Sequence, residues 1–279
     1  MALTDEGRRL TEEHRLAQLA VGANAAIISE SLWDMLDPYD LDGSRQAWIA
    51  SSLIAAQLQF GQSTSLAETY VSSYQAVELP GANEIVIRPY FRPERVAEDL
   101  DLAGPQYIKA LVRDQGLTPE QAHSAARSRM VGVSRKHAMS GGRGLIENTN
   151  NQDRRAIGYR RVTDGDPCTF CAMLASRGAH FGTQRAHSVY RSERTALVRS
   201  SDGGKFHLHC ACATEIVYGH WEPNEREQVY VDAYERAARQ LDQSGKPRTQ
   251  SEVLSLMRAD DQANFRDGLT RRRNSPESD

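Results

Sequence analysis

Four cysteines in two close pairs constrain this chain more than any other feature of its sequence. The first pair is Cys168 and Cys171, the second is Cys210 and Cys212, and the 279 residues contain no other cysteine. Soft ligands at these spacings are typical of one tetrahedral zinc site, here closed by a loop of about forty residues. The pattern therefore predicts a small metal module within a larger chain.

The ligand set of that site has two interpretations. All four cysteines form the first; in the second, His209 or His207 replaces one member of the second pair, because C-x-C is less common as a two-ligand zinc knuckle. Free thiols and disulfides are further alternatives. Nothing resembling a signal peptide precedes the cysteines, so we expect a reducing compartment in which thiolates bind metal. The expected ligands are Cys168, Cys171, His209, Cys210 and Cys212.

Composition argues against two classes of partner. Charged residues make up 25% of the chain and the formal net charge is −3, so neither a strong nucleic-acid partner nor a membrane surface follows from the charge balance. The longest apolar run, residues 19–28, is alanine-rich and too short to span a bilayer. We therefore expect no membrane partner.

The first 139 residues have the pattern of long helices. Apolar residues recur every three or four positions in residues 16–27 and again in residues 48–58, with a proline between the two stripes. Thr118 is placed to cap a later helix that we expect to reach about His137. Residues 85–87 are β-branched and are expected as a strand or an extended arm.

Beyond residue 139 the sequence changes character. Residues 140–144 contain three glycines and indicate a flexible joint, and helical periodicity is absent from 156 to 221. Short stretches at 157–162 and 214–218 are expected as strands. Helices resume after Pro223 and after Thr249, and a polar tail follows residue 271.

These patterns predict a mainly α fold with a small α+β zinc-knuckle-like module, long N-terminal helices and a C-terminal helical tail. We divide the chain into a helical N-terminal domain (1–139), a Cys/His metal module (140–222), and C-terminal helices with a polar tail (223–279). Half of the eight histidines fall at positions 180, 187, 207 and 209. We expect His14, His123 and His137 on helix surfaces.

Catalytic patterns are weak in this sequence. G-x-S-x-G and H-E-x-x-H are both absent. Ser134 and Ser140 flank His137, but such spacing on a helix is more often a surface pair than a catalytic dyad. Glu215 or Glu222 would serve as the base of a zinc nuclease only if a cysteine were not a ligand. A structural role is therefore favoured over a catalytic one.

Arginines are frequent around the cysteines and suggest a further alternative. A basic zinc module could contact DNA phosphates without reading sequence, or its arginines could pair with carboxylates of partner proteins. These arginines are Arg154, Arg155, Arg160, Arg161, Arg177, Arg185, Arg191, Arg194 and Arg199.

Residues 162–178 together with 206–212 resemble the Mu F-like minor head proteins of tailed bacteriophages. The similarity is to the branch found in phages of mycobacteria and related actinobacteria, whose members are often labelled capsid maturation protease. It covers roughly residues 119–218 and is specific in the two cysteine segments. The matching positions are Asp166, Pro167, Cys168, Cys171, Arg177, Gly178, His207, His209, Cys210 and Cys212.

The resemblance implies a structural minor capsid protein that acts in head assembly and DNA passage. Its expected partners are the portal protein and the major capsid or scaffold proteins. Its expected location is the virion, in the capsid interior or at the portal vertex, and the host cytoplasm during assembly. Capsid maturation protease is the implied alternative. The Mu-type pattern has a His-Pro step and an Arg where this chain has Leu208 and Ala211, which leaves the ligand set open.

Overall fold

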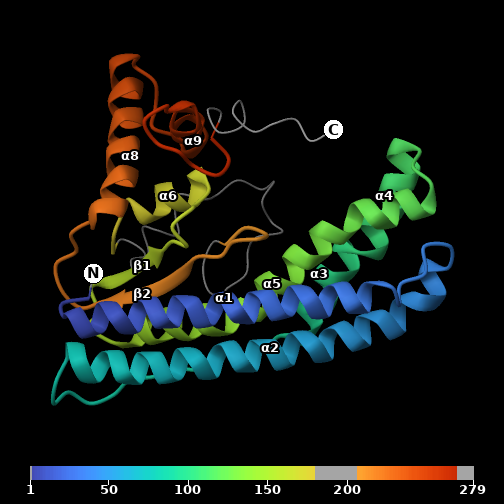
Figure 1. Ribbon diagram of the computed structural model, residues 1–279, viewed down its shortest axis with the longest axis horizontal. Helices are drawn as coiled ribbons and strands as arrows, with labels where there is room; N and C mark the ends of the chain where they lie inside the picture. Colours follow the sequence, from blue (N-terminus) through green and yellow to red (C-terminus); the bar gives the residue numbers. More distant parts are fainter. Residues whose placement is uncertain (1, 180–205, 269–279) are drawn as a thin grey trace.

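The computed structural model describes residues 2–179 and 206–268, and three long helices form its body. Helices α1 (Asp5–Trp33), α2 (Leu41–Glu78) and α5 (Pro119–Gln152) lie side by side (Figure 1). Thr4, Asp40 and Thr118 cap them by accepting a hydrogen bond from a backbone N–H three residues later. The expected long N-terminal helices are confirmed. No helix of the described residues combines the length and apolarity needed to cross a bilayer.

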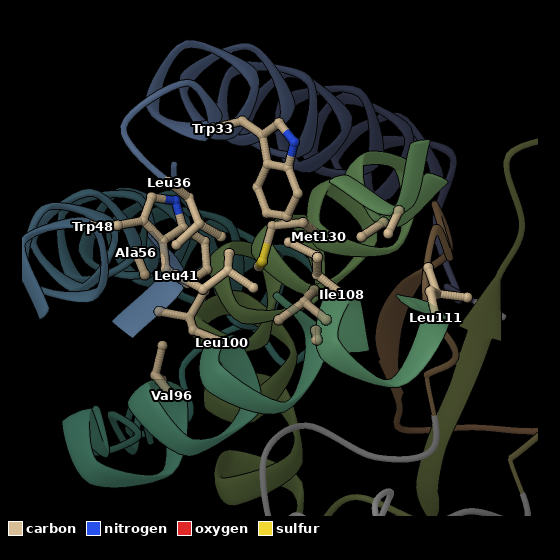
Figure 2. Close-up of a cluster of buried hydrophobic side chains, with 14 residues drawn as sticks. Trp33, Leu36, Leu41, Trp48, Ala56, Val96, Leu100, Ile108, Leu111 and Met130 are labelled. Atoms are coloured by element: carbon tan, nitrogen blue, oxygen red, sulfur yellow. The ribbon is translucent and has the colours of Figure 1, made fainter. Parts of the chain in front are cut away.

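Two short helices, α3 (Pro93–Ala103) and α4 (Pro105–Gln115), cover one end of the body. A cluster of large buried side chains lies beneath them (Figure 2). Trp33 and Trp48 meet edge to face within it, with ring centroids 5.8 Å apart. Gly116 ends α4 in the left-handed conformation, which glycine adopts without steric cost.

Helix α5 continues without interruption through the glycine-rich stretch that we interpreted as a flexible joint. A Cβ atom on Gly141 would lie 2.6 Å from Thr64 Oγ1 and closer still to the carbonyl oxygen of Phe60. A Cβ atom on Gly142 would lie 2.6 Å from Gln18 Nε2. The glycines therefore allow α5 to pack closely against α1 and α2. The prediction of a flexible joint at residues 140–144 is therefore wrong. The domain boundary that we placed between residues 139 and 140 falls within a buried part of α5.

A two-stranded antiparallel sheet lies against α1 and α5 near the other end of the body (Figure 1). Strand β1 (Gly158–Val162) pairs with β2 (Ala213–Val217), and Arg160 lies opposite Glu215. Helices α6 (Thr169–Ala175), α8 (Glu225–Gln243) and α9 (Gln250–Ala259) pack together around a second apolar core. Both strands and the C-terminal helices were expected, and the mainly α fold with a small α+β region is confirmed.

A buried ion cluster joins the sheet to α8 and α2. Arg160 Nε lies 2.7 Å from Glu215 Oε2, and the same guanidinium contacts the carboxylate of Glu227 on α8. Tyr74 of α2 donates its hydroxyl hydrogen to Glu215 Oε1 at 3.0 Å. All four residues are buried. Loss of Arg160 would therefore leave two carboxylates without a counter-charge in a low-dielectric environment.

Residues 83–92 connect α2 to α3 in an extended conformation that forms no strand within the described chain. Gln75 exchanges two hydrogen bonds with the backbone of Ile85, at 2.8 and 2.9 Å. The backbone N–H of Ile87 donates to Thr149 Oγ1 at 3.0 Å. Of the two expectations for residues 85–87, the extended arm is confirmed.

Two of the histidines expected on helix surfaces are buried. His14 is 5% exposed and stacks on Tyr70 with ring centroids 4.3 Å apart. His137 is 4% exposed, and its Nε2 lies 3.1 Å from Asp99 Oδ2. His123 is half-buried. The surface interpretation is wrong for His14 and His137 because the three long helices bury polar as well as apolar positions where they meet.

The close packing of α5 can be tested with a pair of glycine substitutions. Gly141→Ala should lower the free energy of unfolding by about 2 kcal/mol or more, because the added methyl overlaps atoms of α2. Gly61→Ala is the control, since nothing lies within 4 Å of its Cβ position in α2. It should raise stability by about 0.5–1 kcal/mol through helix propensity. Urea denaturation measures both, and equal effects would contradict the packing.

Burial of His14 predicts an acid-sensitive contribution to stability. Burial lowers the pKa of His14 to about 3, so below about pH 6.5 the unfolded chain binds a proton that the folded chain does not. The free energy of unfolding that comes from keeping His14 neutral is complete above pH 6.5 and is lost as the pH falls towards 3. We expect the free energy of unfolding to fall by about 2 kcal/mol between pH 7 and pH 5 for this reason.

The variant His14→Phe keeps a ring beside Tyr70 but removes the titrating group. Urea denaturation at pH 7 and pH 5 should show a smaller loss of stability for this variant than for the wild type. Equal losses in the two proteins would show that His14 is accessible to protons in the folded state.

Candidate metal centre

The first cysteine pair is positioned by the start of α6. Cys168 is the N-cap residue, and Cys171 lies in the first turn of the helix. The start of α6 is anchored by Asp267, whose Oδ1 accepts hydrogen bonds from the backbone N–H and the hydroxyl of Thr169 at 2.6 and 2.8 Å. The two thiols are therefore held by a fixed turn of backbone.

The second pair lies in the segment that leads into β2. The sulfur atoms of Cys171, Cys210 and Cys212 lie within 4.8 Å of one another, and Cys171 and Cys210 are 3.5 Å apart. Cys171 also belongs to a second group, with Cys168 and His207. Pairing of β1 with β2 brings together cysteines that are 39 residues apart in the chain. The two groups share Cys171 and form one continuous cluster.

Of the two histidines before the second pair, the structure brings His207 to the thiols. His207 Nε2 lies 2.8 Å from Cys168 Sγ and 3.5 Å from Cys171 Sγ. His209 adopts a positive φ of 61°, and its ring packs on α5 against Gly132, where a Cβ would be 2.7 Å from Nε2. Of the expected ligands, the four cysteines therefore lie in the cluster and His209 lies outside it.

A buried arginine provides positive charge at the thiols. Arg161 of β1 places Nη1 3.6 Å from Cys171 Sγ and 3.5 Å from Cys210 Sγ. Burial opposes the charge of the guanidinium, but the neighbouring thiols raise the pKa of Arg161 above its ordinary value. The charged side chain therefore favours the thiolate forms, which are the forms that bind metal.

A second buried arginine, Arg143 of α5, holds the backbone of the second cysteine segment. It donates hydrogen bonds to the carbonyl oxygens of Cys210 at 2.8 Å and Cys212 at 2.9 Å. The ring of Phe206 lies between two guanidinium groups, with the Cζ atoms of Arg143 and Arg161 at 3.7 and 4.0 Å from its centroid. This stack attaches the cluster to the long helix.

The sequence interpretation missed the role of these three side chains. Arg143 was assigned to a flexible joint and Arg161 to a DNA-contacting group. The sequence carries no local signal for the role of Arg143, because the carbonyl groups that it binds lie 67 and 69 residues further along the chain.

Without a metal, the cluster holds opposite charges close together. A hydrogen bond with Cys168 opposes ionisation of Cys171, but the other two buried thiols and Arg161 lower the pKa of Cys171 to about 5. Burial opposes protonation of His207, but the nearby sulfur atoms raise its pKa to about 9. At neutral pH a thiolate therefore faces an imidazolium, and a metal ion would displace the imidazole proton.

The residues in the cluster fit a soft divalent metal ion. Four sulfur donors and one imidazole are available where a tetrahedral structural zinc site needs four ligands. Zinc bound by three or four thiolates carries a net negative charge. The two buried guanidinium groups of Arg143 and Arg161 offset that charge and lower the cost of burying it.

The arginines considered as DNA contacts have different surroundings. Arg160 and Arg161 are both 5% exposed and face carboxylates and thiols, so neither offers its charge to a phosphate backbone. Arg155 pairs with Asp153, with Nε and Oδ1 2.7 Å apart. Four others, Arg185, Arg191, Arg194 and Arg199, lie outside the described residues, as do His180 and His187. DNA contact remains a prediction.

The serines considered as nucleophiles do not reach a base. Ser134 Oγ donates to Ser29 Oγ at 3.0 Å, and Ser140 Oγ donates to the backbone carbonyl of His137 at 2.7 Å. Glu215 is held in the buried ion cluster, and Glu222 is exposed. Within the described chain, neither serine hydroxyl is hydrogen-bonded to an imidazole nitrogen.

The structure is that of a mainly helical protein with a buried cysteine cluster that could hold a metal ion, and sequence comparison adds its family. The VG15 protein family matches residues 6–240, which span the helical body and both cysteine segments. The chain therefore belongs to the VG15 protein family, a viral gene-product family that indicates a phage protein. Neither the curated proteins nor the solved structures contain a match to this chain.

Proposed function

We propose that this protein is a minor capsid protein that acts in phage head assembly and that a structural zinc ion stabilises its cysteine module. The observation that carries the proposal is the family match over residues 6–240, which includes both cysteine segments. The long helical body, the buried thiols and the lack of a serine–imidazole pair in the described residues are consistent with a structural part.

The zinc ligands that the geometry favours are Cys168, Cys171, His207 and Cys210. His207 Nε2 is close to the sulfur atoms of both residues of the first pair. Cys210 completes this set because its Sγ lies 3.5 Å from Cys171 Sγ, and Cys212 is the alternative fourth ligand in an all-cysteine site. Zinc with three thiolates carries one negative charge, which Arg161 faces directly.

The proposed partners are the portal protein and the major capsid or scaffold proteins, and the proposed location is the virion, at the portal vertex or the capsid interior. The rigidity of the body supports this role. Its three long helices are each at least about 40 Å long at 1.5 Å per residue, and the module is attached to them by buried polar contacts. Such a body can present a fixed surface to an assembling shell.

One observation favours a second candidate, a cysteine protease. Cys168 is the only half-buried thiol of the four, its Sγ lies 2.8 Å from His207 Nε2, and hydrogen bonding with Cys171 lowers its pKa. Catalysis would also need free backbone N–H groups to bind the developing oxyanion. The N–H of Thr169, next to the thiol, is already bound by Asp267. A shared metal ion accounts for the same thiol–imidazole proximity without this requirement.

Zinc content tests the proposed ligand set. The purified chain should contain about one zinc ion per molecule by mass spectrometry of the metal. Cys171→Ser and His207→Ala should reduce this to about a tenth or less, because each removes a ligand. His209→Ala and Cys212→Ser are matched controls that should keep the ion. Loss of zinc in Cys212→Ser with retention in His207→Ala would instead assign an all-cysteine site.

Virion incorporation tests the function itself. In the phage that encodes this chain, mass spectrometry of purified particles should find the protein at a few copies per head. Cys171→Ser should lower its incorporation and the yield of DNA-filled heads, because the module loses its stabilising ion. Complete absence of the wild-type protein from virions would contradict the proposal. If Cys168→Ala prevented shortening of the major capsid protein while zinc remained bound, the protease would be the correct function.

A further inference from the structure

A pocket of about 310 Å³ lies between the extended arm, α2, α3 and α5. Phe60 of α2 and Val96 of α3 form part of its wall, and Ser140 and Asn148 of α5 add polar atoms. It shares no lining residue with the metal centre. Its occupant therefore has to be inferred from its own charges and shape.

Three arginines line this pocket, and one of them has no counter-charge. Arg88 is paired with Glu68, and Arg95 Nε lies 3.7 Å from Asp99 Oδ1. Arg92 is exposed, and its guanidinium makes no ion pair or hydrogen bond within residues 2–179 and 206–268. The mouth of the pocket therefore presents a single uncompensated positive charge.

Two other nitrogen-bearing side chains of the wall, those of Arg95 and His137, lie near the carboxylate of Asp99. The distances from Arg95 Nε and His137 Nε2 to the nearest oxygen of Asp99 are 3.7 and 3.1 Å, so both side chains have a partner inside the protein.

Aromatic rings and free backbone groups complete the binding surface. The rings of Phe60 and Phe91 meet edge to face with centroids 5.2 Å apart, and Tyr90 is 78% exposed beside them. The backbone groups of residues 88–91 make no hydrogen bond within the described chain. An extended peptide can pair with such a segment while its side chains enter the adjacent pocket.

The charge arrangement favours a peptide over a nucleic acid. A nucleic acid presents a phosphate at every nucleotide and binds through several free cations. Of the three arginines of this pocket, Arg92 alone has no partner in the described chain, whereas Arg88 is paired with Glu68 and Arg95 with Asp99. We infer that this pocket binds an extended segment of a partner protein that inserts one carboxylate side chain flanked by aromatic residues. The inference does not depend on the metal centre.

Calorimetric titration of the full chain tests this with three probes: N-acetyl-Phe-Glu-Phe-amide, its Phe-Gln-Phe counterpart and the oligonucleotide (dT)12. The carboxylate peptide should bind at least five-fold more tightly than the amide peptide. Arg92→Gln should remove that difference. Arg154→Gln is the matched control, because Arg154 is also exposed and has no partner in the described chain but lies outside the pocket. It should leave the difference unchanged.

Several results would overturn the inference. These are equal affinity for the two peptides, no binding of the carboxylate peptide at millimolar concentration, and equal weakening by the two arginine variants. Tighter binding of (dT)12 than of the carboxylate peptide, weakened by Arg92→Gln, would assign the pocket to nucleic acid instead. Zinc content and virion incorporation are measured independently, so failure here is distinguishable from failure of the proposed function.

Discussion

The contact between Cys171 and Cys210 connects two segments that are 39 residues apart, and the arrangement of the small sheet around it depends on that closure. The strands bury apolar side chains against the helical body, and α6 buries its own against α8 and α9, so packing also holds these segments in place. Thiolate–metal bonds supply about 10 kcal/mol in small zinc modules. The metal ion that we propose at the cluster would add to this packing by tying the two cysteine segments together.

Buried arginines extend this constraint into the rest of the molecule. Arg161 neutralises the thiols from β1, while Arg143 binds the same segment from α5, with Phe206 between the two. On the other face of the sheet, Arg160 and Tyr74 meet at Glu215. Each contact leaves a buried charge or polar group unsatisfied if it breaks. The module and the helical body are consequently held in one fixed relation.

Local patterns in the sequence predicted much of this structure. Helix caps, apolar stripes and β-branched runs located the long helices, both strands and the C-terminal helices, because each signal acts within a few residues. The glycines of α5 were misread because Gly141 is required by the approach of Phe60 and Thr64, which are distant in sequence.

The site was predictable in part for the same reason. Cysteine spacing identified the donors, since a C-x-x-C pair carries its geometry within one turn. The choice between His207 and His209 depends on how the segment packs on α5, where Gly132 accommodates the ring of His209. The role of Arg161 follows from strand pairing that places it under the thiols. Neither fact is contained in local spacing.

X-ray absorption at the zinc edge of the purified chain measures the central interaction most directly. Coordination of one ion by both cysteine segments predicts a first shell of three sulfur atoms at about 2.3 Å and one nitrogen at about 2.0 Å. A shell of nitrogen and oxygen atoms, or a folded protein that contains no metal, would contradict the proposed metal closure of the two segments.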